Sequence, residues 1–141
     1  MNNMKGGFNS SFVEIRTIEG DKFLKDIKPN DLILTHGKQF SKVKLINQRL
    51  AKPRDVVYNV YYHTFTEEGV IDRISGDQEL LDGTLIKDLV IGDSMLHKNG
   101  DVAIVDKIEK METVNRFFYS IQLKGGKTFY VNNICIKSDQ I

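Results

Sequence analysis

Ile-Ser-Gly-Asp-Gln-Glu-Leu-Leu-Asp-Gly-Thr-Leu-Ile-Lys-Asp-Leu-Val-Ile-Gly-Asp-Ser-Met-Leu, residues 74–96, is the stretch that decides the fold. Its second half occurs a second time in the chain, at residues 20–34. The two copies are related by a spacing of 62 positions (93 − 31), which sets Asp31 on Asp93. The chain therefore consists of two related halves.

The repeat continues on both sides of this stretch. At the same spacing residues 24–27 fall on residues 86–89, and with a shift of one position residues 57–60 fall on residues 118–121. Two copies of a strand–turn–strand unit can bury their apolar faces against each other. We therefore expect a single pseudo-two-fold, all-β domain whose halves comprise about residues 12–75 and 76–138.

Runs rich in β-branched and aromatic residues, separated by turn signals, predict strands along most of the chain. The predicted strands lie at residues 12–18, 32–34, 43–50, 56–65, 70–75, 102–108, 117–123 and 128–136. Pro29 ends any helix begun at residues 23–27. Residues 105–112 are the best candidate for a longer helix, but their spacing also fits an alternating strand.

The composition is that of a globular protein. The 141 residues are 40% hydrophobic and 28% charged, which is enough for one domain with a real core. A net charge of +1 argues against general nucleic-acid binding. The lack of a run of about 18 apolar residues argues against a membrane span. Residues 1–7 lack the apolar core of a signal peptide and are expected to form a flexible lead-in to a domain of residues 8–141.

The residues that commonly bind metals are few and scattered. Cys135 is the only cysteine, so an internal disulfide is excluded, and its strand-like surroundings predict a buried apolar role. His36, His63 and His97 show no ligand spacing with one another or with Cys135. We expect neither a metal site nor a cofactor.

Four short motifs follow one another in a fixed order. They are Thr-Ile-Glu-Gly at residues 17–20, Asp-Ile-Lys-Pro-Asn-Asp at 26–31, Ser-Gly-Asp-Gln-Glu-Leu at 75–80 and Asp-Leu-Val-Ile-Gly-Asp at 88–93. Together with the internal repeat, this order resembles the Hint domain shared by Hedgehog proteins and inteins. The resemblance spans about residues 8–138 and implies a Hint-like β fold built from two related halves.

The resemblance also implies self-processing, which begins when an N-terminal cysteine or serine attacks the preceding carbonyl. Counting back without gaps from residues 14–20 places the family's first residue on Phe8. Phenylalanine cannot perform this reaction. Ser10 and Ser11 are the nearest hydroxyls, and either would need a local deletion to take the role.

The family's Thr-x-x-His element supplies an imidazole that protonates the scissile amide nitrogen. Here the element is Ser75-Gly76-Asp77-Gln78. Ser75 can still donate a hydrogen bond, but the amide of Gln78 has no useful pKa. We therefore expect general acid catalysis to be lost.

The C-terminal positions of the family are also changed. Ser120 stands where a catalytic aspartate often lies, and Lys127 replaces a histidine. Lys137 and Ser138 occupy the places of the penultimate histidine and the terminal asparagine. Serine has no amide nitrogen and cannot form the succinimide, and Asp139 does not resemble the nucleophile expected after the junction.

Three further groups of residues have plausible structural explanations. Two aromatic clusters could stack nucleic-acid bases, but they match across the repeat, which favours packing. They comprise Tyr58, Tyr61, Tyr62, Phe65, Phe117, Phe118 and Tyr119. An acidic group could hold a cation, but turn formation explains it better; its members are Asp72, Asp77, Glu79 and Asp82.

A basic run is interpreted mainly as a solvated face, although it could contact an acidic partner. Its members are Lys38, Lys42, Lys44, Arg49, Lys52 and Arg54.

Every aligned chemical position of the family is thus altered, while the turn and core positions are kept. The favoured hypothesis is a catalytically inactive Hint-like domain that acts as a structural or protein-interaction module, in a phage virion head or tail or in the cytoplasm, without nucleic acid or membrane. The alternative is residual self-cleavage at Ser10 or Ser11, assisted by Ser75 and Asp77. In either case the fold should bring residues 8–11, Gln78 and residues 137–138 together.

Overall fold

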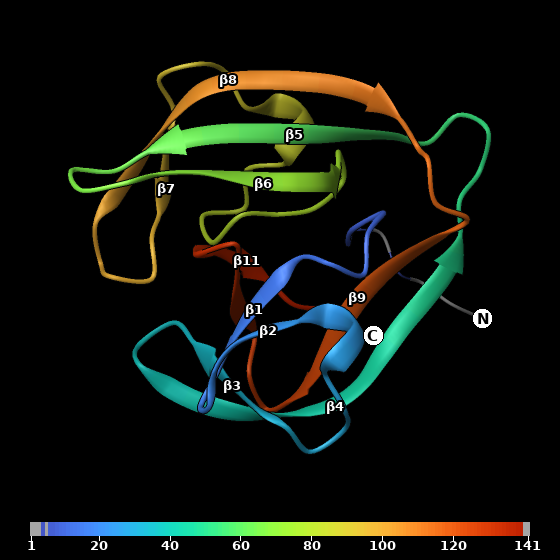
Figure 1. Ribbon diagram of the computed structural model, residues 1–141, viewed down its shortest axis with the longest axis vertical. Coiled ribbons are helices and arrows are strands. Elements are labelled where there is room, and N and C mark those ends of the chain that lie inside the picture. Colours follow the sequence, from blue (N-terminus) through green and yellow to red (C-terminus); the bar gives the residue numbers. More distant parts are fainter. Residues whose placement is uncertain (1–3, 5, 140–141) are drawn as a thin grey trace.

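The computed structural model describes residues 4 and 6–139 and is built almost entirely from β-strands (Figure 1). The strands are β1 (Glu14–Thr17), β2 (Gly20–Phe23), β3 (Leu32–Thr35), β4 (Gln39–Leu50), β5 (Val56–His63), β6 (Glu68–Ser75), β7 (Ser94–Leu96), β8 (Val102–Glu112), β9 (Phe117–Lys124), β10 (Thr128–Val131) and β11 (Ile134–Lys137). Two single turns of 3₁₀ helix, η1 (Leu24–Asp26) and η2 (Ile86–Asp88), each precede a strand.

The strands form two antiparallel sheets. One has the order β11-β10-β1-β3-β4-β9 with β2 paired to β1, and the other has the order β6-β5-β8-β7. Figure 1 shows the first sheet curling around the lower part of the molecule and the second covering its top. Most of the buried isoleucines, valines and phenylalanines of both sheets form one shared core. The all-β prediction is therefore confirmed.

The sequence repeat is present in the structure as a repeat of hydrogen bonds. The bounds of η2 lie 62 positions after those of η1. The N–H of Val43 donates to the carbonyl of Asp31 (2.9 Å), and the N–H of Val105 donates to that of Asp93 (2.9 Å). These four residues keep the same spacing, so the two halves are built alike.

The two halves exchange strands. β4 of the first half pairs with β9 of the second, and β8 of the second half pairs with β5 of the first. The registers are equivalent, because Leu50 lies opposite Phe117 and Glu112 lies opposite Val56. Neither half can therefore be separated without breaking both long strand pairs.

Two sequence predictions concerned local structure. Residues 105–112 belong to β8, so the alternating-strand interpretation was right and the helix was wrong. Residues 128–136 form a hairpin rather than one strand. The turn is Asn132-Asn133, whose φ values of 45° and 72° suit asparagine in a two-residue reversal. The strands β2 and β7, of four and three residues, were not predicted.

The beginning of the chain differs from the expected flexible lead-in. Met4, Gly6 and Gly7 are buried. The Met4 side chain packs with Val57 and Phe118 in a small second cluster. These three residues therefore pack against the domain, and the other members of the expected lead-in, residues 1–3 and 5, lie outside the described part.

The aromatic and acidic groups largely follow their structural interpretations. Tyr62 and Phe118 are buried in the core, whereas Phe65 is 98% exposed at the β5–β6 turn and is an exception. Asp77 forms an ion pair with Lys87 (3.1 Å). Among residues 4 and 6–139, no cluster of acidic, histidine or cysteine side chains is arranged to bind a metal, and no helix is suited to crossing a membrane.

Candidate functional site

Gln78 occupies the centre of the candidate site. It follows β6 in a tight turn in which its N–H donates to the carbonyl of Ser75 (3.1 Å). The hydroxyl of Ser75 accepts the N–H of Asp77 (3.2 Å), which stabilises this turn. The turn directs the Gln78 side chain into the protein, where only 4% of the residue is exposed. A buried amide of this kind must have its hydrogen bonds satisfied.

Gln78 and Ser75 together hold the backbone of Gly7. The Gly7 N–H donates to Gln78 Oε1 (2.8 Å), and the Gly7 carbonyl accepts the N–H of Ser75 (2.8 Å). The backbone amide facing position 78 is therefore that of Gly7. Counting along the sequence had placed Phe8 there, so the count was off by one residue.

The site has no room for side chains at Gly6 and Gly7. A Cβ on Gly6 would overlap Gln78 Oε1, and a Cβ on Gly7 would overlap the carbonyl oxygen of Tyr119. Gly7 also has a φ of 103°, which disfavours any other residue. The Gln78 side chain and the Tyr119 backbone thus fill the space where a nucleophilic side chain would have to lie.

The amide nitrogen of Gln78 binds the C-terminal part of the chain. Gln78 Nε2 donates to the carbonyls of Lys137 (2.8 Å) and Glu79 (3.0 Å). Ser138 follows directly and is buried, and its N–H donates to the carbonyl of Lys127 (2.9 Å). Gln78 therefore connects the two ends of the domain, and the expected convergence of Gln78 with residues 137–138 is confirmed.

Phe8, Ser10 and Ser11 lead away from this point. Phe8 is buried, and its N–H donates to the carbonyl of Tyr119 (2.8 Å). The hydroxyl of Ser10 accepts the N–H of Phe12 (3.1 Å), and the carbonyl of Ser11 accepts a bond from η1. These hydrogen bonds of Ser10 and Ser11 therefore point toward β1 and η1 rather than toward Gln78.

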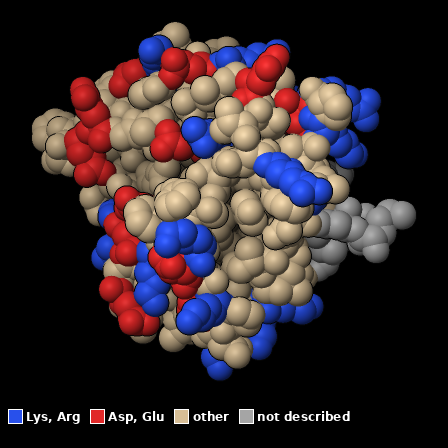
Figure 2. All heavy atoms as spheres, turned by 45° about the vertical axis from the view of Figure 1, so that its right-hand side comes forward, with Lys and Arg blue, Asp and Glu red and all other residues tan. Residues whose placement is uncertain are grey.

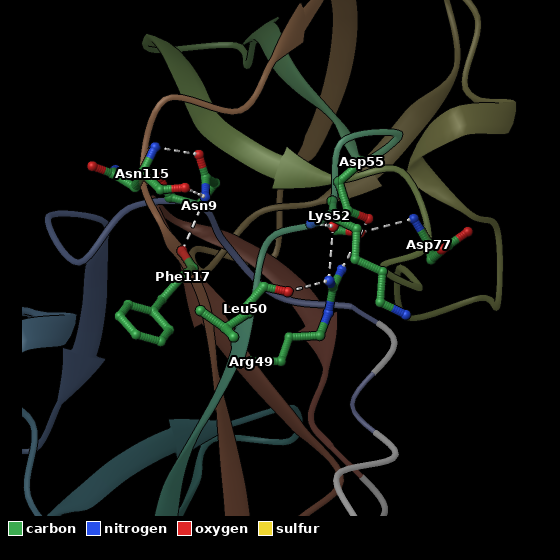
Figure 3. Close-up of polar contacts among 9 residues, drawn as sticks. Asn9, Arg49, Leu50, Lys52, Asp55, Asp77, Asn115 and Phe117 are labelled. Atoms are coloured by element: carbon green, nitrogen blue, oxygen red, sulfur yellow. Dashed lines mark hydrogen bonds and ion pairs between the residues drawn. The ribbon is translucent and has the colours of Figure 1, made fainter.

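Asn9 is a second residue that holds the N-terminal segment in place. The sequence did not predict this role. Its side chain is fully buried and donates to the carbonyls of Asn115 (2.9 Å) and Phe117 (2.9 Å). Its Oδ1 accepts the N–H groups of Val114 and Asn115, both at 3.0 Å. Figure 3 shows Asn9 reaching the segment between β8 and β9, about 105 positions away in the sequence. No local sequence pattern predicts a contact of this range.

A third polar group surrounds Ser120. Ser120 is buried on β9 opposite Asn47, and Asn47 Nδ2 donates to Asp139 Oδ2 (2.6 Å). Burial raises the pKa of the Asp139 carboxyl, although the hydrogen bond from Asn47 acts in the opposite direction. The sequence had placed Ser120 at an aspartate position, and the structure supplies the carboxyl from Asp139 nearby. The Asn47–Asp139 pair forms because the chain returns to β9 after the end of β11.

Two other residues singled out in the sequence are Lys127 and His97. Lys127 is exposed beside the Gly125-Gly126 tip. His97 is fully buried, hydrogen-bonds Glu67 through Nε2 and accepts the Asn99 N–H at Nδ1 (3.2 Å). Both of its ring nitrogens are thus engaged by protein groups, which fits a structural role.

The described geometry resembles that of solved inteins. The gp41-1 intein is 19% identical, with a TM-score of 0.74 over 96% of this chain and 100% of that one. An intein-like domain from Clostridium thermocellum is 17% identical, with a TM-score of 0.71 over 96% and 100%. The Ssp DnaB mini-intein variant M86 is 13% identical, with a TM-score of 0.74 over 98% and 96%.

Neither a protein-family model nor a curated protein matches the sequence. At these identities the likeness to solved structures concerns the fold. The all-β architecture built from two related halves agrees with it. The chain therefore has the fold of the Hint domains of Hedgehog proteins and inteins.

Proposed function

We propose that this chain is a Hint-fold domain without autoprocessing activity that acts as a structural or protein-interaction module. The observation that carries the proposal is the hydrogen bonding of Gln78 to Gly7 and Lys137. A carboxamide cannot transfer a proton near neutral pH, so the residue at the acid position holds the two ends together without protonating either.

The neighbouring positions support the same proposal. Gly7 has no side chain and Phe8 has no nucleophilic atom, so neither can attack a preceding carbonyl. Ser138, at the place of the terminal asparagine, has no amide nitrogen with which to form a succinimide. The remaining candidates, Ser10 and Ser11, form hydrogen bonds toward β1 and η1.

The proposed setting is a phage virion, as a component of its head or tail, with other virion proteins as partners. This setting depends on the resemblance to Hint-like modules carried in phage genomes. Proteomic analysis of purified particles tests it, because a virion component should be recovered in fixed ratio to the major structural proteins. A monodisperse monomer that co-purifies with no particle, tail or partner protein would contradict it.

Intact mass spectrometry tests the loss of activity. The full chain is incubated for long periods with thiol or hydroxylamine, which trap a thioester or ester. An unchanged mass supports the proposal. A fragment ending at Asn9 or Ser10 would overturn it in favour of self-cleavage, and the Ser10→Ala and Ser11→Ala variants would then identify the nucleophile.

A further inference from the structure

Lysines gather without acidic partners where β4 meets β9. Lys42 lies directly opposite Lys124 in the β4–β9 pairing, and both are exposed. Like charges placed opposite each other destabilise a sheet. Lys124 Nζ donates to the neutral amide oxygen of Asn30 (2.9 Å), and Lys44, also exposed, lies at the bulge of β4. We call Lys42, Lys44 and Lys124 the lysine cluster; within the described residues no salt bridge includes any of them.

The internal repeat provides a comparison for this cluster within the same molecule. The equivalent bulge and strand pairing recur between β5 and β8. The positions corresponding to the three lysines there are, in order, Ile104, Asp106 and His63. His63 Nδ1 and Asp106 Oδ1 lie 2.7 Å apart, so this half carries a hydrogen-bonded pair and no lysine at these positions. The fold therefore does not require three lysines without salt-bridge partners at these positions.

The charge around the cluster is unbalanced over a longer stretch. Residues 32–54 contain six lysines and arginines and no acidic residue, which leaves 14 of the 20 basic residues and all 19 acidic ones elsewhere. Figure 2 shows mainly basic side chains along the lower margin, over the β3–β4 part of the molecule. Arg49 is neutralised by Asp55 (2.9 Å; Figure 3) and does not add to the uncompensated charge at Lys42.

An apolar side chain accompanies this charge. Phe40 lies two positions before Lys42 on β4 and is 44% exposed. Residues two apart on a strand project from the same face. Phe40 and Lys42 thus present an aromatic ring and ammonium groups together.

We propose that the lysine cluster and Phe40 form a docking surface for an acidic segment of a partner protein that carries carboxylates beside an apolar side chain. Charge complementarity selects carboxylates, and Phe40 selects the apolar group. A long nucleic acid fits less well, because the chain outside residues 32–54 has an excess of acidic residues that would repel it. This inference rests on the proposed binding role, but it is tested by binding and not by cleavage.

NMR titration of the full ¹⁵N-labelled chain with a short synthetic peptide of Glu, Asp and Leu tests the proposal. Amide shifts should concentrate at Phe40, Lys42, Lys44 and Lys124, and affinity should fall as salt rises from about 0.05 to about 0.3 M. The K42Q/K124Q double variant should weaken binding about three- to tenfold. The K107Q/K110Q variant on β8 removes the same charge from the other sheet and should leave the affinity unchanged.

Three results would overturn the proposal. The peptide could cause no shifts, or shifts away from the lysine cluster. The K107Q/K110Q variant could weaken binding as much as K42Q/K124Q. An oligothymidylate of equal charge could bind more tightly than the peptide, which would make nucleic acid the partner class. None of these results affects the intact-mass test of cleavage, so the two proposals can fail separately.

Discussion

Replacing Gln78 with leucine tests the connection between the two ends of the domain. Leucine has a similar size, so the change mainly removes hydrogen bonds. Three are lost: the bond from the N–H of Gly7 and the two bonds to the carbonyls of Glu79 and Lys137. Each contributes about 1 kcal/mol net, and a buried N–H left without a partner adds about 1–3 kcal/mol. We expect Gln78→Leu to lower the free energy of unfolding by about 4–6 kcal/mol.

Urea denaturation followed by circular dichroism measures this loss, since the chain has no tryptophan to report by fluorescence. A loss of this size is a large share of the roughly 5–15 kcal/mol typical of a domain. Gln39→Leu is the matched control, because Gln39 is exposed on β4 and its replacement should change stability by less than about 0.5 kcal/mol. Equal, small losses for Gln78→Leu and Gln39→Leu would refute the role assigned to Gln78.

Further predictions concern the neighbouring backbone, Asn9 and the single thiol. Gly7→Ala should cost at least about 1–3 kcal/mol in urea denaturation, because alanine is strained at a φ of 103° and would overlap a carbonyl; a neutral effect would contradict the close packing. Asn9→Ala should speed hydrogen exchange at the amides of Val114 and Asn115, whose acceptor it removes; unchanged exchange at these two amides would show that the bonds are unimportant. Burial raises the pKa of Cys135 to about 11, so at pH 8 the folded thiol should not react with a disulfide reagent, and it should react as pH rises toward 11 or after unfolding; rapid labelling at pH 8 would show that the thiol is accessible.

The sequence predicted those parts of the fold that depend on short-range patterns. The matching turns at Asp31 and Asp93 use the same local bonds, so a single spacing identified them and the two halves. The two-residue turn at Asn132-Asn133 was missed because asparagines within a strand-like run do not specify a reversal by themselves.

The candidate site was predicted only in part. The position of Gln78 followed from the motif order, and its replacement of an acid was visible in the sequence. The sequence did not predict which backbone amide Gln78 contacts. An ungapped count cannot show that the chain enters the site one residue earlier, at Gly7. The buried bonds of Asn9 and Asp139 join segments far apart in the chain and could be found only from the structure.

We propose that this Hint-fold domain does not process peptide bonds. To test this, the full chain is placed between two folded reporter proteins and the masses of all products are determined after prolonged incubation, with a self-splicing intein in the same fusion as the positive control. We expect a single unprocessed fusion. Ligated reporters, or a reporter released at residues 6–11 or 137–139, would contradict it.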